Sequence, residues 1–100
     1  LDPGIYSSPV SDGAVVHSLE HGMIWISYNP NLLNEEQVAA LREIAKKFDN
    51  DVVLSPRPSN AGPVAAVSWG RRLRLTNIDA ELLSEFVTTN RNRSPEPGVR

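Results

Sequence analysis

A helix placed between two apolar strands is the feature that most constrains the fold of this chain. Residues 23–28 (MIWISY) are apolar almost throughout, which is typical of a strand buried in the middle of a sheet. Residues 35–48 then carry apolar side chains at helical spacing, and residues 52–54 (VVL) have the composition of a second buried strand. This order predicts a right-handed crossover that joins two parallel strands.

The central helix has clear start signals. Asn34 is a favourable N-cap, and Gln37 is three residues further on, where it completes a capping box. Leu33 and Val38 are spaced as a hydrophobic staple across that cap. The sequence therefore predicts a helix from about 35 to 48. One apolar stripe runs along it, made of Val38, Leu41, Ile44, Ala45 and Phe48.

The rest of the chain predicts shorter elements. Asp12 is expected to cap a short helix that ends at His21, and residues 64–69 form a third strand. The strict alternation of residues 72–75 (RLRL) predicts a fourth strand with one solvated face. Asp79 is expected to cap the last helix, which buries one side. That side consists of Ile78, Leu82, Leu83, Phe86 and Val87.

Together these elements predict a single two-layer domain of the α/β (α+β) class. A mixed four-stranded sheet is covered by two main helices and a short N-terminal helix, with thioredoxin-like or ferredoxin-like layering. Residues 1–11, rich in proline, glycine and serine, are interpreted as a surface loop. The globular domain is expected to span residues 1–93, and residues 94–100 to form a flexible tail.

Composition excludes several classes of function. A formal net charge of −2 argues against a nucleic-acid-binding module, and the absence of cysteine excludes disulfides and thiolate metal sites. No apolar run approaches the roughly 20 residues that a membrane-spanning helix needs. Because the chain begins at Leu1 rather than methionine, we expect it to be part of a longer protein, with any leader or anchor upstream.

Residues 17–22 (HSLEHG) hold the only two histidines of the chain. A spacing of four places His17 and His21 on one face of a helix, where two imidazoles are able to bind one metal ion. Met23, the only methionine, would add a thioether that suits copper. The hypothesis is therefore a copper or zinc site formed by His17, His21 and Met23, with Glu20 as a further ligand or a neighbour that orients one.

Two alternatives compete with a metal-binding site. The letters H-x-x-E-H match an inverted zinc-protease pattern, in which Glu20 would be the general base. Such enzymes need a third ligand and a substrate cleft, and Gly22 is expected to end the helix directly after the motif. The other alternative is a packed helix end. A helical wheel groups Val15, Val16 and Leu19 and places both histidines nearly opposite, away from the core.

Arg57 is a second candidate, for binding an anion. It lies between Pro56 and Pro58, which stiffen the backbone and so present one guanidinium from a rigid loop. The alternative is an ion pair with one of the 12 acidic residues. The large aromatic side chains are expected in the core or on a sheet face; they are Trp25, Tyr28 and Trp69.

Several segments resemble the bacterial family called domain of unknown function 3105, which has no established activity. They are residues 4–6 (GIY), 16–22 (VHSLEHG), 28–30 (YNP), 56–58 (PRP), 66–70 (AVSWG) and 91–97 (RNRSPEP). The resemblance implies an extracytoplasmic domain that follows a single N-terminal membrane anchor. It also implies an upstream segment similar to Thr-Ser-Gly-Pro-His, whose histidine would be a third ligand outside this chain. Many relatives carry a small residue in place of Met23.

The sequence thus favours a non-catalytic, extracytoplasmic domain that binds copper or zinc. The alternative is an interaction or scaffold module of the cell envelope without metal, and the third hypothesis is a small metal-dependent hydrolase. The expected partners are the metal ion and another envelope protein. No nucleic acid is expected, and contact with a membrane is expected only through an anchor outside this chain.

Overall fold

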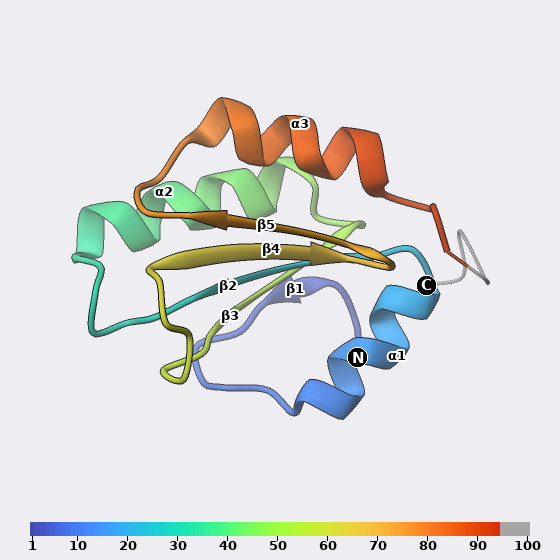
Figure 1. Ribbon diagram of the computed structural model, residues 1–100, viewed down its shortest axis with the longest axis horizontal. Helices are drawn as coiled ribbons and strands as arrows, with labels where there is room; N and C mark the ends of the chain where they lie inside the picture. Colours follow the sequence, from blue (N-terminus) through green and yellow to red (C-terminus); the bar gives the residue numbers. More distant parts are fainter. Residues whose placement is uncertain (95–100) are drawn as a thin grey trace.

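The computed structural model describes residues 1–94 and consists of a sheet with helices on both faces (Figure 1). Its elements are β1 (Gly4–Ile5), α1 (Asp12–Glu20), β2 (Ile24–Tyr28), α2 (Glu35–Lys47), β3 (Val52–Pro56), β4 (Val64–Ser68), β5 (Arg71–Leu75) and α3 (Ala80–Asn90). The predicted tail, residues 94–100, lies outside the described residues except for residue 94.

The mixed sheet has the strand order β1-β3-β2-β4-β5. Strands β1, β3 and β2 are parallel, whereas β4 pairs with β2 and β5 in antiparallel fashion. The predicted α+β class and the parallel crossover through α2 are confirmed. The sheet has five strands rather than four, because Gly4 and Ile5 pair with Val53 and Leu54. A two-residue strand that contains glycine has no local pattern, so only this long-range pairing defines it.

Helices α2 and α3 cover one face of the sheet, and α1 packs on the other (Figure 1). The main core lies under α2 and α3. Its fully buried side chains include Ile24, Ile26, Leu41, Val52, Leu54, Leu83 and Val87. A smaller cluster lies under α1 and consists of Val15, Leu19, Met23, Trp25 and Val53. This second face is therefore covered over only part of its width.

Helix α2 begins as the sequence predicts. The Asn34 side chain accepts a hydrogen bond from the Gln37 backbone N–H at 2.9 Å, and the Gln37 side chain accepts one from the Asn34 N–H at 2.9 Å. The N-cap of α3 is Asp79, also as predicted. None of the helices within residues 1–94 has the length and apolar character to cross a membrane.

Three details around α1 and the hairpin differ from the prediction. The N-cap of α1 is Ser11, whose Oγ accepts from the Ala14 N–H, so Asp12 is the first helical residue. Val16 is exposed, because Ser18 takes the core-facing position and satisfies its hydroxyl by donating to the Leu1 carbonyl at 2.7 Å. Trp69 is 41% exposed, because it lies past the end of β4, in the turn of the hairpin.

Candidate functional site

The structure brings the two predicted histidines into direct contact. His17 lies in the last turn of α1 and His21 is its C-cap, so their side chains are one helical turn apart. The two Nε2 atoms are 3.1 Å apart, and the rings meet edge to face with centroids 4.6 Å apart. The His17 side chain is exposed, as the helical wheel predicts for both histidines, whereas His21 is half-buried. The pair thus forms a small nitrogen-rich surface site.

The distance between the two Nε2 atoms is compatible with two arrangements. Nitrogens bound to one tetrahedral zinc ion at about 2.0–2.1 Å lie about 3.3 Å apart, close to the 3.1 Å in the structure. A hydrogen bond between the rings also fits this distance. The two arrangements exclude each other, because the hydrogen bond needs a proton on one Nε2 and a metal ion needs both lone pairs.

Glu20 lies on the other side of the His17 ring. Its Oε2 is 3.9 Å from His17 Nδ1, which is too far for a hydrogen bond. A proton on Nδ1 leaves Nε2 of a neutral ring with its lone pair, which is the tautomer that a metal ligand needs. Glu20 thus lies beside the nitrogen that would face away from a metal ion, the nitrogen to which carboxylates often hydrogen-bond in metal sites.

Further metal ligands are few in the described part of the chain. Within residues 1–94, no group of three or more histidine, aspartate and glutamate side chains is arranged to hold a metal ion. Met23 is 3% exposed and packs in the apolar cluster under α1. The described residues therefore offer a metal ion two nitrogens, from His17 and His21.

The segment after α3 lies directly against the end of the histidine motif. Gly22 has a left-handed backbone with φ of 88°, as predicted for the residue that ends this helix. The Asn92 N–H donates to the Gly22 carbonyl at 2.9 Å. A Cβ at position 22 would lie 2.6 Å from the Asn92 Cα. Glycine is therefore required both for the left-handed backbone and for the close approach of Asn92. Sequence reasoning missed this approach, because 70 positions separate the two residues.

Arg57 forms an ion pair with an acidic residue, Asp12. The sequence offered such an ion pair as the alternative to an anion-binding site. Its Nε and Nη2 donate to the two carboxylate oxygens of Asp12 at 3.3 and 2.9 Å. Its Nη1 donates to Asn60 Oδ1 at 2.9 Å, and the guanidinium lies 5.8 Å from the centre of the Trp25 ring. Arg57 therefore ties the loop after β3 to the start of α1.

The hydrogen bonds from Arg57 lower the pKa of Asp12, although burial opposes the shift. A carboxyl whose pKa is lowered by folding stabilises the fold above its unfolded pKa, and this contribution is lost as the pH falls through the folded pKa. We expect Asp12→Asn to reduce the free energy of unfolding at pH 7 by under about 1 kcal/mol, because the carboxylate is largely exposed.

Urea unfolding of both proteins at pH 7 and at about pH 2.5 checks this prediction. The difference between wild type and Asp12→Asn should shrink at the lower pH. Asp49→Asn, which removes an exposed carboxylate that no arginine contacts in the described residues, is the control. An equal difference at both pH values would show that the charge of Asp12 does not contribute.

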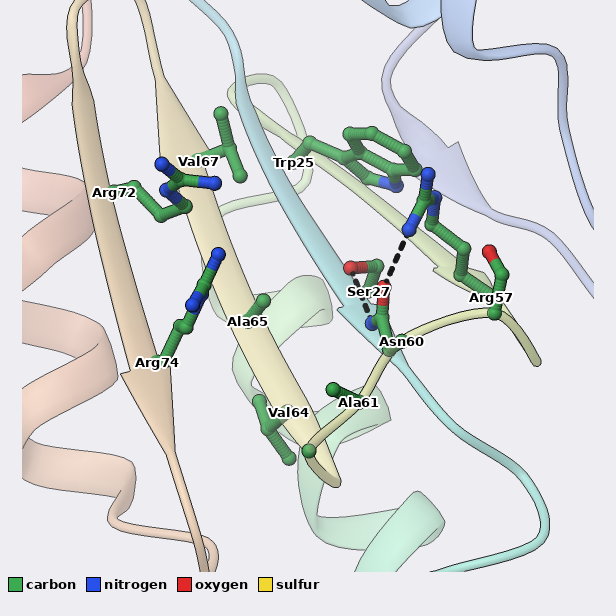
Figure 2. Close-up of a pocket in the computed structure, with 12 residues that line it drawn as sticks. Trp25, Ser27, Arg57, Asn60, Ala61, Val64, Ala65, Val67, Arg72 and Arg74 are labelled. Atoms are coloured by element: carbon green, nitrogen blue, oxygen red, sulfur yellow. Dashed lines mark hydrogen bonds between the residues drawn. The ribbon is translucent and has the colours of Figure 1, made fainter.

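A groove with a volume of about 410 Å³ lies on the sheet face that carries α1. Figure 2 shows its floor of β2, β4 and β5 and its wall formed by the loop after β3. The lining includes three arginines, Arg57, Arg72 and Arg74, together with Trp25. Neither histidine lines the groove. The sequence predicted only that Arg72 and Arg74 lie on the solvated face of a strand. The alternation in β5 places them on one face, but it does not show which residues of other segments lie next to that face.

Comparison with known proteins supports one assignment. A protein-family model described as "Protein of unknown function (DUF3105)" matches residues 1–100. No curated protein matches the chain, and no solved structure matches it. The match confirms the resemblance that the motifs indicate.

Proposed function

We propose that this chain, which belongs to the DUF3105 family, binds a copper or zinc ion through His17 and His21 in a non-catalytic role. The observation that carries the proposal is the 3.1 Å separation of the two Nε2 atoms, which fits a shared metal ion without rearrangement of the helix. Glu20 would orient His17 from the far side of the ring. Two imidazoles favour Cu(II) over Zn(II) in intrinsic affinity.

A complete site needs ligands beyond this pair. Water or a donor outside the described residues would fill the remaining positions, and the histidine-containing upstream segment of the family is our proposed source. Met23 is left out of the proposed ligand set, because its side chain packs among apolar residues. An extracytoplasmic location behind a membrane anchor, and a partner protein in the envelope, are proposed on the family resemblance alone.

Isothermal titration of Cu(II) and Zn(II) tests the proposal on wild type and on the His17→Ala/His21→Ala variant. We expect a Kd in the micromolar range or tighter for wild type and at least about a tenfold loss in the variant. Binding should also weaken as the pH falls below about 6, because imidazole binds metals only in its neutral form. Glu20→Gln is the control that keeps both ring nitrogens and should lose much less affinity. Equal binding by wild type and the double variant would overturn the proposal.

An interaction or scaffold module without metal is the second candidate. It is favoured by the same contact, because a hydrogen bond between the rings would by itself order the turn that leads into β2. In that case the double variant should be less stable than wild type in the presence of a chelator. A hydrolase is supported less, because the histidines do not line the groove on the sheet.

We also infer thioredoxin-like rather than ferredoxin-like layering. The ferredoxin-like order has a helix between its third and fourth strands. Here β4 and β5 follow β3 without an intervening helix, and they form an antiparallel hairpin at one side of the parallel strands. The absence of cysteine excludes thiol redox chemistry on this scaffold.

A further inference from the structure

The groove is built by two rows of side chains that cross the sheet. In one row Trp25 pairs with Val67, and Val67 pairs with Arg72. Paired residues of adjacent strands lie on the same face, so these three side chains stand side by side. In the next row Ser27 pairs with Ala65 and Ala65 with Arg74. Each row therefore ends in an arginine at the edge strand, with small or apolar side chains in the middle.

The charge of the groove is opposite to that of the chain. Its lining residues include three arginines and no aspartate or glutamate, although the chain has a net charge of −2. The charge of Arg57 is offset by Asp12. Arg72 and Arg74 form no ion pair within residues 1–94. Among residues 1–94, the open side of the groove thus carries two positive charges without an ion-pair partner, which favour a negatively charged ligand.

A serine on the floor of the groove, hydrogen-bonded to the opposite wall, adds a hydrogen-bond donor. Asn60 Nδ2 donates to Ser27 Oγ at 3.0 Å, while Asn60 Oδ1 accepts from Arg57, so a chain of hydrogen bonds runs from Asp12 to Ser27. Ser27 is 2% exposed and accepts this bond, and its own O–H forms no bond within residues 1–94. A hydroxyl held this way can donate to an oxygen atom of a ligand.

The middle of the groove is apolar and rigid. Ala65 and Val67 are half-buried on its floor, and the Trp25 indole is held by a hydrogen bond from Nε1 to Ser55 Oγ at 2.9 Å. A volume of about 410 Å³ lies in the range of pockets that take small organic molecules, about 300–1,000 Å³. An inorganic anion would leave this apolar floor unused.

We propose that the groove binds a small organic anion, whose carboxylate or phosphate group is held by Arg72 and Arg74 and whose apolar part lies over Ala65 and Val67. Figure 2 shows that the two arginine side chains reach from β5 toward the floor of the groove. Arg57 and Asn60 would close the opposite side. This site is separate from the histidine pair, so it stands whether or not the chain binds a metal ion.

The two tryptophans of the chain provide a direct test. Trp25 lines the groove, whereas Trp69 lies in the hairpin turn and does not line it. We would titrate the ¹⁵N-labelled protein with benzoate and with phenyl phosphate and follow the two indole N–H signals by NMR. The Trp25 signal should shift and saturate at millimolar concentrations while the Trp69 signal stays in place. The tighter of the two probes identifies a carboxylate or a phosphate ligand.

Two double variants keep the test falsifiable. Arg72→Gln/Arg74→Gln should weaken probe binding at least about tenfold. Arg71→Gln/Arg93→Gln removes the same charge at exposed positions outside the groove and should change the affinity less than about twofold. Equal losses in both variants would show that only net charge matters and would overturn the proposal.

Further probes separate the roles of charge and apolar area. Inorganic phosphate and uncharged benzamide should each bind at least about tenfold more weakly than the better organic anion. Inorganic phosphate that binds as tightly would contradict the role of the apolar floor. Binding of an acidic extended peptide, without binding of either small anion, would also overturn the proposal and assign the groove to a protein partner.

Discussion

Replacing Gly22 with alanine is expected to lower the free energy of unfolding by about 3 kcal/mol. Two costs add up at this position. The backbone φ of 88° is unfavourable for any residue with a Cβ, and the new Cβ would lie 2.6 Å from the Asn92 Cα. The backbone after α3 would have to move away, which also breaks the hydrogen bond from Asn92 to the Gly22 carbonyl. Urea unfolding followed by circular dichroism measures the loss.

Gly70→Ala is a matched control for this prediction. Gly70 also has a left-handed backbone, with φ of 79°, but a Cβ there would have no neighbouring atom within 4 Å. It should therefore show only the conformational cost, about 1 kcal/mol. If the two variants were equally destabilised, the close approach of Asn92 would not contribute to stability. Because Gly22 follows His21 directly, Gly22→Ala should also weaken any metal binding by the pair.

The sequence predicted what depends on neighbours along the chain. The α2 cap, the left-handed Gly22 at the end of α1 and the position of His17 and His21 on one helical face all follow from residues close together in the sequence. What it missed depends on tertiary pairing. The strand β1 exists only through its partners in β3, and the groove exists only because β5 lies beside β4. Such pairings have no signal in a short window of sequence.

The same contrast between local and long-range interactions applies to the residues of the candidate sites. Arg57 and Asp12 are 45 positions apart, and nothing in the sequence distinguishes Asp12 from the other acidic residues as its partner. The predicted N-cap role of Asp12 is wrong because Ser11 occupies that position, and this leaves the carboxylate of Asp12 directed at Arg57. Asp12 thus takes part in a long-range ion pair instead of the predicted local N-cap, and this ion pair holds the loop after β3.

Asn29 is the second residue whose role the sequence did not show. Its side chain is buried and makes three hydrogen bonds. Nδ2 donates to the Pro58 and Asn60 carbonyls at 3.2 and 2.9 Å, and Oδ1 accepts from the Asn31 N–H at 3.0 Å. One amide therefore joins the end of β2 to the loop that forms a wall of the groove.

Asn29→Ala is expected to lower the free energy of unfolding by about 2–3 kcal/mol, because it removes a buried amide and leaves two carbonyls and one N–H without their hydrogen-bond partner. Asn31→Ala, at an exposed position in the same turn, should cost under about 0.5 kcal/mol and serves as the control. The loop that carries Arg57 and Asn60 should also become more mobile. Amide hydrogen exchange should therefore accelerate at Arg57, Ser59 and Asn60 more than in α2. Exchange that accelerates equally in both segments would mean that Asn29 supports the whole fold and not this loop in particular.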